Sequence, residues 1–306
     1  MTQSQTSYSA DQEVAQVRRR RTRGERIRLL LKKSPFTARI GLAIIIFYGL
    51  MALVGPFFAP YGESEIAGPP LAPWGNGFLF GTDQIGRDIL SRLIFGARNT
   101  IGIALAATLL AFFLGGSLGL VAAISRGWVD QFISRSIDVV MAIPALIFAL
   151  MLLTITGSNV WALVVIIALL DSTRVFRLTR SVAVSVSVMD YVEAARLRGE
   201  GLSWTMRREV LPNILPPLVA EFGLRFCFVS LTIAALSFLG VGIQPPTADW
   251  GTMVRETANM MQFARFDITA GLTPLMPAAC IALLTIGVNF VVDWFLQTTS
   301  GLRDET

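Results

Sequence analysis

The chain has 306 residues, of which 53% are hydrophobic and only 15% are charged, and its formal net charge is +5. With a mean hydropathy of +0.60, this composition lies outside the range of an ordinary soluble domain and indicates a membrane protein. There is no histidine, and the two cysteines, Cys227 and Cys280, lie inside apolar segments. The composition therefore argues against a zinc site, a Ser-His-Asp triad and a disulfide framework.

Six apolar segments approach or exceed the length of about 20 residues that a membrane-spanning helix needs. The fourth is the weakest, because Asp171 and Arg174 stand at its end. We therefore predict an all-α polytopic protein with six transmembrane helices. The expected spans are 38–59, 100–124, 132–156, 160–176, 218–243 and 268–296.

Arginines predict the orientation of these spans. The tail 1–37 contains an arginine run at 18–21, and short segments rich in Lys and Arg stay in the cytoplasm. We expect this tail to be disordered and to contact anionic lipid headgroups rather than nucleic acid. The full-length first span that follows it indicates a retained anchor rather than a cleaved signal peptide. Six spans would return the carboxyl tail, 298–306, to the cytoplasmic side.

The loops divide the chain further. Segments 60–98 and 244–267 balance their few arginines with acidic residues, so both are expected outside the cytoplasm. We thus expect a first helix with its outer segment at 38–98 and a five-helix core at 99–297. The loop between spans four and five, about 183–215, is rich in arginine and is predicted to be cytoplasmic.

This loop begins with the signals of a short helix. Asp190 is a predicted N-cap, and Glu193 stands three residues later in the capping-box arrangement. Ala194 and Ala195 open a shallow place on this helix where another protein could approach closely. A helix that rests on lipid headgroups explains the same pattern equally well.

A corner and a second helix are predicted to follow. Gly199 and Gly201 supply the freedom to adopt positive φ that ends a helix and turns the chain. Ser203 is expected to cap a second short helix through Val210, which Pro212 stops.

The motif Glu193-Ala194-Ala195, with Gly199 four residues later and Leu211-Pro212 beyond it, resembles the signature of the permease subunits of binding-protein-dependent ABC importers. Glu209 departs from that pattern, which has a hydrophobic residue two positions before the Leu. Four further segments resemble the dipeptide, oligopeptide and nickel branch of the family. They are FGTDQIGRDILSRLIFGAR (80–98), LPNILPP (211–217), LSFLGVGIQPPTADWG (236–251) and NFVVDWF (289–295).

The resemblance implies a permease subunit in a bacterial inner membrane, with a coupling helix that seats in a groove of a cytoplasmic ATPase. Glu193 would meet basic or polar groups there, with Arg196 on the same helix. Ala194 and Ala195 would permit close seating, and Gly199 would make the turn. The implied partners are a homologous second permease, two ATPase subunits and an extracytoplasmic binding protein.

Nucleotide chemistry is not expected in this chain. Its only lysines, Lys32 and Lys33, do not stand in a G-x-x-x-x-G-K-[ST] pattern, so no P-loop can form. ATP and Mg²⁺ are thus expected on partner chains, and we expect this chain to bind no cofactor or metal and to be no enzyme. Di- or oligopeptides are the default substrate that the branch implies, with nickel complexes, opines or oligosaccharides left open.

A secondary transporter driven by an ion gradient is the alternative, because ionisable residues in apolar spans suggest a transport pathway. Asp138, Glu221 and Arg225 are the candidate pathway residues. Structural ion pairing is the other explanation: Asp138 has Arg135 three residues before it, and Glu221 has Arg225 four residues after it.

Small and kinking residues are expected to shape the packing of the spans. Gly115, Gly116 and Gly119 permit close helix contacts, and Pro144 and Gly157 permit bends.

Overall fold

The computed structural model describes residues 34–75, 77–125, 127–157 and 159–299. The arginine run at 18–21 and nearly all of both predicted tails lie outside these ranges. Within them the regular elements are helices, with two isolated β-bridges, Ile66 to Arg87 and Thr82 to Asp88. The prediction of an all-α protein is confirmed for the described residues.

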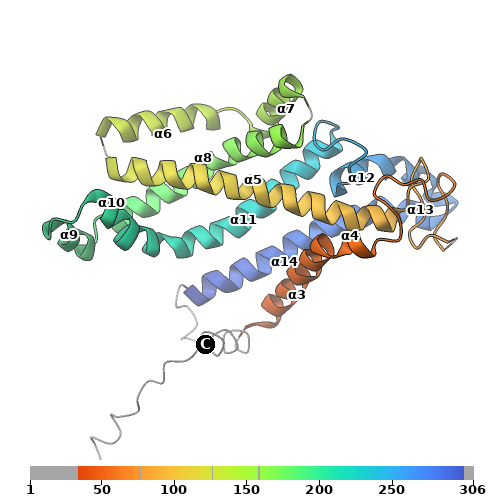
Figure 1. Ribbon diagram of the computed structural model, residues 1–306, viewed down its shortest axis with the longest axis horizontal. Helices are drawn as coiled ribbons and strands as arrows, with labels where there is room; N and C mark the ends of the chain where they lie inside the picture. The colour runs from red at the N-terminus through yellow and green to blue at the C-terminus, as the bar shows by residue number, and fades with distance from the viewer. Residues whose placement is uncertain (1–33, 76, 126, 158, 300–306) are drawn as a thin grey trace, which may run out of the picture.

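Five long helices form an elongated bundle (Figure 1). Their bounds differ from those of the predicted spans, most of all in two cases: the second span begins at Ile89 rather than 100, and the fourth continues to Ser187, which places Asp171 and Arg174 near its middle. The five are α3 (Phe36–Leu53), α5 (Ile89–Ser125), α8 (Val160–Ser187), α11 (Leu211–Phe238) and α14 (Leu275–Thr299).

Polar caps start several helices. Asn159 accepts a 3.0 Å hydrogen bond from the Trp161 amide at the start of α8. Asp88 accepts from the amide and the hydroxyl of Ser91 at the start of α5. Each carboxylate or amide oxygen satisfies a backbone donor that the first helical turn leaves free.

The predicted third span is broken. It consists of α6 (Gly127–Met141) and α7 (Ala145–Thr156), whose axes bend by 85°. Pro144 explains the break, because proline lacks an N–H and its ring clashes with a preceding helical turn. The predicted third span is therefore bent within 132–156, and Pro144 as a bending point is confirmed.

Length and composition support four or five spans among the described residues rather than six. Four segments are long and apolar enough to cross a membrane, and the bent pair α6–α7 makes a fifth if it forms one span. Helix α8 is long enough, but three charged residues fall within its first 18 positions: Asp171, Arg174 and Arg177. The four segments are Phe36–Leu53, Ile89–Ser125, Leu202–Phe238 and Ile268–Thr299.

Helices α5 and α8 form the closest pair of the bundle. A Cβ atom on Gly115 would overlap the Ser172 carbonyl oxygen, and one on Gly119 would stand 2.8 Å from the Thr179 Cβ. By contrast, a Cβ on Gly116 would meet no atom within 4 Å. The predicted packing role therefore holds for Gly115 and Gly119 and not for Gly116.

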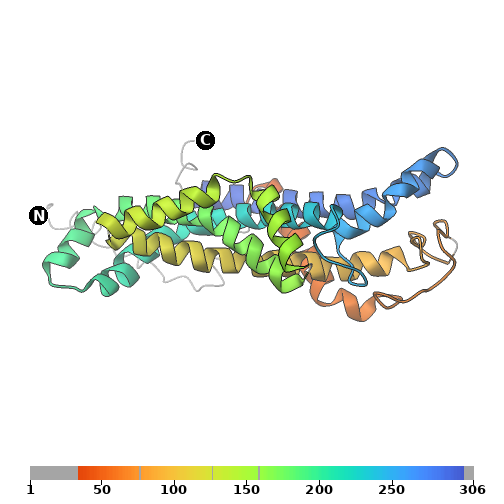
Figure 2. The ribbon, with the colours of Figure 1, turned by 90° about the horizontal axis from the view of Figure 1, so that it is seen from above.

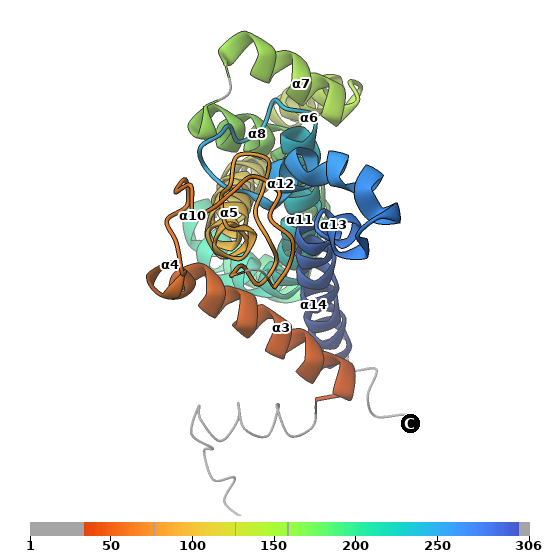
Figure 3. The ribbon, with the colours of Figure 1, turned by 90° about the vertical axis from the view of Figure 1, so that its right-hand side faces the viewer.

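A second close crossing joins α3 to α14, where Gly41 and Gly287 face each other. Figure 3, an end-on view, shows α3 lying across the side of the bundle beside α14. The main core is filled by apolar side chains of the long helices and by Trp250, which is fully buried. Its indole nitrogen donates a 3.0 Å hydrogen bond to the Leu93 carbonyl of α5.

The connecting segments gather at opposite ends of the bundle (Figures 1 and 2). At one end lie α9 (Asp190–Leu197) and α10 (Leu202–Thr205). At the other lie segment 59–88, α12 (Trp250–Thr257), the 3-10 helix η2 (Ala258–Arg265) and α13 (Ile268–Leu272). The two segments predicted to share one side of the membrane thus share one end of the molecule.

A buried ion network joins those two segments. The Arg87 Nε atom donates to the Asp83 carboxylate at 2.6 Å, and Arg92 Nη1 donates to the same carboxylate at 2.8 Å. Both arginines also contact the Glu256 carboxylate, at 3.1 and 2.5 Å. The GTDQIGRD motif (81–88) therefore connects segment 59–88 to α12.

Candidate coupling surface and charged cluster

Helix α9 begins at Asp190, but its N-cap is Met189. The amides of Val192 and Glu193 bond to the Met189 carbonyl at 2.9 and 3.1 Å, and no side chain caps the helix. The predicted capping box is therefore wrong, because the extended backbone of Met189 already closes the first turn. Asp190 and Glu193 still lie in that turn, where the helix dipole favours acidic side chains.

Gly199 makes the predicted turn, with φ of +84°. Its amide bonds to the Arg196 carbonyl, and the Glu200 amide bonds to the Ala195 carbonyl. These bonds are typical of a helix end that closes through a left-handed residue. Gly201 has φ of −68° and is the N-cap of α10, so its predicted left-handed role was wrong.

The predicted second helix does not stop at Pro212. Ser203 lies inside α10 rather than capping it, and α10 continues through a π-helical segment, η1 (Met206–Val210), into α11. Pro212 is accommodated in the first turn of α11, where a missing N–H costs least. The Asn213 side chain also donates a 2.6 Å hydrogen bond to the Glu209 carbonyl, which satisfies an acceptor near the irregular turn.

The two alanines of the motif face different ways. Ala195 and Val192 are fully buried and share the inner face of α9, whereas Glu193 and Ala194 are exposed. The predicted shallow surface made by both alanines is therefore wrong, since three residues separate Ala195 from Val192 and place them on one side of the helix. Val192 belongs to a small core that includes Ala123 of α5, Ala183 of α8 and Ile214 of α11. This core fixes α9 to three long helices.

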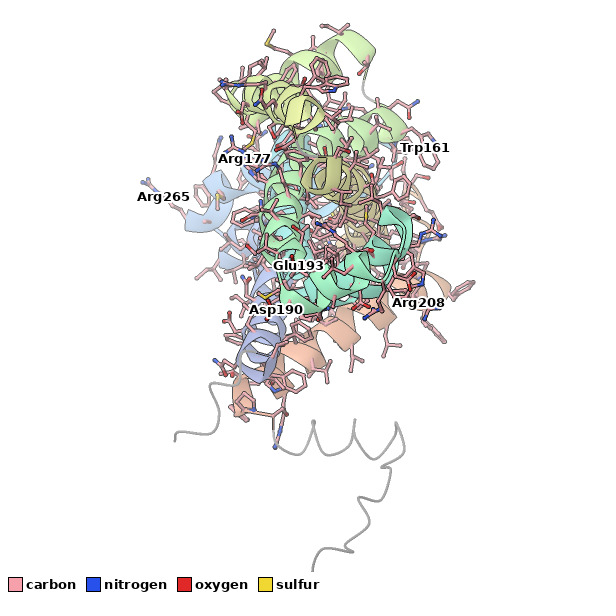
Figure 4. The ribbon with its side chains drawn as sticks, turned by 90° about the vertical axis from the view of Figure 1, so that its left-hand side faces the viewer. Trp161, Arg177, Asp190, Glu193, Arg208 and Arg265 are labelled. Carbon is pink, nitrogen blue, oxygen red and sulfur yellow. The ribbon has the colours of Figure 1, made fainter. Side chains whose placement is uncertain are left out.

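A cavity of about 400 Å³ lies beside the exposed face of α9. Glu193, Arg196 and Leu197 line it from α9, and Ser187 and Val188 line it from the end of α8. Figure 4 looks onto this end of the molecule, with Asp190, Glu193 and Arg208 on the short helices nearest the viewer. The side chains of Arg196, Arg198, Arg207 and Arg208 are all exposed, and so is Leu197, at 83%. The surface therefore combines an acid, several arginines and an apolar side chain.

A second set of charges lies within the bundle, between α8 and α11. Glu221 and Arg225 form the predicted pair, with Oε1 and Nε 2.7 Å apart. Asp171 joins them from α8, 3.7 Å from Arg225, and also pairs with Arg174 at 3.3 Å. The Arg225 guanidinium stacks 4.7 Å from the ring centre of Phe228. The sequence interpretation missed Asp171 and Arg174 because it treated them as the end of a span.

Asp138 does not pair with Arg135. Its carboxylate accepts a 2.7 Å hydrogen bond from Arg177 of α8, and Asp130, two turns earlier, binds Arg180. Helix α6 turns this acidic face toward α8, so the partners come from the next helix rather than from its own turn.

The described residues contain no group of three or more His, Cys, Asp or Glu side chains placed to hold a metal ion. The two sites above are therefore ionic and apolar surfaces. Their arrangement can bind another chain or a charged solute.

Comparison with known proteins places these features in context. Residues 115–299 match the family described as binding-protein-dependent transport system inner membrane component. The chain is 36% identical over 261 residues to the di/tripeptide transport system permease protein DppC of Pseudomonas aeruginosa, across 83% of this chain and 86% of that protein. It is 33% identical over 274 residues to the dipeptide transport system permease protein DppC of Haemophilus influenzae, across 87% and 88%.

Solved structures show the same fold. A chain of the inward-facing MetNI methionine ABC transporter superposes with a TM-score of 0.55 at 16% identity, covering 69% of this chain and 97% of that one. A chain of an amino acid ABC transporter gives a TM-score of 0.50 at 21% identity, with 69% and 99% covered.

Proposed function

Because the chain belongs to the family of binding-protein-dependent transport system inner membrane components, we propose that it is a permease subunit of an ATP-driven importer of di- or oligopeptides. The names of its relatives support peptides as the substrate class. In this role the chain supplies half of a membrane pathway, and a homologous second permease supplies the other half. ATP and Mg²⁺ bind to two separate ATPase subunits, and an extracytoplasmic protein delivers the peptide.

The exposed face of α9 is the proposed contact with the ATPase. The observation that carries this proposal is the pairing of an exposed charged face with a rigid attachment: Glu193 and Arg196 line one cavity, while Val192 is buried in the small core. A push on α9 would therefore pass to α5, α8 and α11 through packed side chains. Ala194 allows close approach, Arg196 offers a charged contact, and Gly199 sets the direction in which the chain leaves the helix.

This role fixes the proposed topology. The end of the bundle that carries α9 faces the cytoplasm, together with both chain termini, and the end that carries α12 faces outward. Helix α8 and the bent α6–α7 pair complete six membrane passages. Arginines at this end support the orientation: Arg196 lies on α9, Arg198 is its C-cap, and Arg207 and Arg208 lie on η1.

The intramembrane ion pairs have a structural role in this proposal. Glu221, Arg225 and Asp171 lie close enough to neutralise one another, which lowers the cost of charges at membrane depth. Asp138 is neutralised by Arg177 in the same way. A secondary transporter would instead need one of these groups to exchange an ion during each cycle.

The test is co-purification of the assembled importer carrying Glu193→Lys. We expect the second permease to remain and ATPase retention to fall by about tenfold or more, because reversing a charge at an interface leaves its partner unpaired. Gly199→Val should act in the same direction, since a β-branched residue is strained at φ of +84°.

Glu65→Lys is the matched control, because it makes the same charge change at the opposite, outer end of the molecule, where Glu65 is exposed. Full ATPase retention by the Glu193 and Gly199 variants would contradict the coupling role of α9. A wild-type chain that binds no ATPase and transports on an ion gradient would support the secondary transporter instead.

A further inference from the structure

The break between α6 and α7 borders a cavity of about 200 Å³. Met141, Ile143 and Pro144 line it from the break, and Thr173 and Arg174 line it from α8. Arg174 stands near the middle of the 28-residue helix α8, so the cavity lies at the depth of the membrane rather than at either end of the bundle.

Irregular backbone at this depth requires water or protein around it. Residues 142–144 are not helical, and Pro144 offers no N–H to the carbonyl groups before it. Within a bilayer such peptide groups are tolerated where they are buried in protein or line a water-filled space. The cavity borders this irregular backbone and leaves room for water beside its peptide groups.

Arg174 is the charged side chain that opens into this space. Its side chain is 47% exposed, compared with 6% for Asp171 and 13% for Arg225. Within the described part of the chain its Nη1 atom donates to Asp171 at 3.3 Å, whereas a guanidinium carries five N–H donors. The remaining donors are available to an acceptor in the cavity.

The neighbouring charges allow Arg174 to change partner. Asp171 also lies 3.7 Å from Arg225, which is itself held by Glu221 at 2.7 Å. If Arg174 turned toward another carboxylate, Asp171 would keep a cation beside it. The two acids and two arginines balance, so an added anion would be attracted by Arg174 without meeting an excess of negative charge.

From this geometry we propose that Arg174 binds the α-carboxylate of a peptide as it crosses the membrane. The inference rests on the proposed peptide importer and names the part of the substrate that this chain contacts. Arginine and a carboxylate form paired, charge-assisted hydrogen bonds. A cavity of about 200 Å³ admits the terminal residue and not a whole peptide. Recognition of the shared carboxylate leaves peptide side chains unselected.

Thiol protection in the solubilised, assembled importer tests this assignment. Met141→Cys, in a chain with Cys227→Ser and Cys280→Ser, places a reactive group in the cavity wall, and a water-soluble methanethiosulfonate reports its accessibility. We expect dialanine to slow labelling and its C-terminal amide to be about tenfold less effective, since the amide loses the charged contact.

Three further variants separate a specific contact from general charge balance. Arg174→Gln should abolish protection by dialanine, and Arg174→Lys should retain part of it. Arg177→Gln, which removes an exposed arginine one turn away that is paired with Asp138, should leave protection unchanged. Equal protection by dialanine and its amide, equal loss in the Arg174→Gln and Arg177→Gln variants, or an introduced thiol that does not react would each overturn the inference.

ATP-driven uptake of dialanine by the wild-type importer distinguishes the two proposals. Uptake without protection of the thiol introduced by Met141→Cys would overturn the carboxylate site alone. No peptide uptake would overturn the proposed function itself.

Discussion

Asp249 shows how the end of the molecule that carries α12, which we propose faces outward and call the outer end, tolerates a buried carboxylate. It is the N-cap of α12, where it accepts hydrogen bonds from the Thr252 amide at 3.0 and 3.1 Å. Burial raises the pKa of this carboxyl above its ordinary value, and the bonds from Thr252 oppose that rise only in part. Asp267, the N-cap of α13, has the opposite shift, because the hydrogen bond from the Thr269 hydroxyl lowers its pKa.

The two caps predict opposite pH dependences. Because the pKa of Asp249 is raised in the folded state, the wild-type protein loses stability as pH rises and this carboxyl ionises. Asn does not ionise, so the melting temperature of Asp249→Asn relative to wild type should increase from acidic to neutral pH. A lowered pKa means that Asp267 stabilises the fold above its unfolded pKa, so the relative melting temperature of Asp267→Asn should decrease over the same range. Thermal unfolding of the purified protein at several pH values measures both. Parallel trends for the two variants would contradict the assignment.

At the scale of elements, the contact between α5 and α8 depends on one glycine and not on its neighbour. Gly115→Ala would drive a methyl group into the α8 backbone, and overpacking of this kind typically costs about 1–3 kcal/mol. Gly116→Ala points into open space and should be neutral, or stabilising by up to about 1 kcal/mol, because alanine favours helix over glycine. Melting temperatures of the two single variants provide the comparison. A similar loss in both would mean that the close crossing does not limit stability.

Sequence patterns predicted features that lie within one segment better than they predicted contacts between segments. The apolar runs predicted helices near the observed ones, Gly199 was correctly placed at a turn, and Glu221 pairs with Arg225 because both lie on one helix. The cap at Met189 and the passage through Pro212 were missed, since a backbone carbonyl and a π-helical turn leave no distinctive side-chain signal. The partners of Asp138 and Asp171 were missed for another reason: they depend on which helix faces which.

The same limit applies to the candidate site. The motif at 193–195 located the exposed helix, but the sequence did not reveal that Ala195 faces inward, because only the position of Val192 in the small core determines it. The cavity at Arg174 forms where α8 packs against the break between α6 and α7. Its residues are spread over 140–174, and no local pattern connects them.

At the scale of the whole molecule, the outer end is held together by charges from segments far apart in the chain. Arg92 is only 1% exposed and contacts both Asp83 of segment 59–88 and Glu256 of α12. Glu63 adds a link, because its carboxylate accepts from Asn99 of α5 at 2.9 Å and from the Ala248 amide. The outer ends of α3, α5 and α11 are therefore tied to one polar assembly.

Arg92→Met should loosen this assembly. Removing one member of a buried ionic group leaves the opposite charges uncompensated, which costs roughly 3–5 kcal/mol when no other cation is present. Arg87 remains beside both carboxylates, so we expect a loss near or below the lower end of that range. Arg98, which is exposed and lies on α5 like Arg92, provides the matched control, and Arg98→Met should have little effect on the melting temperature.

Limited proteolysis from the outer side distinguishes a local from a global effect of Arg92→Met. Because Asp83 and Arg87 hold segment 59–88 against Glu256, this variant should be cleaved faster in that segment while the end that carries α9 still retains the proposed ATPase partner. Loss of ATPase binding together with outer cleavage would mean that the two ends unfold as one unit. Unchanged cleavage and melting temperature would mean that Trp250 and the apolar core hold the outer end without the ion network.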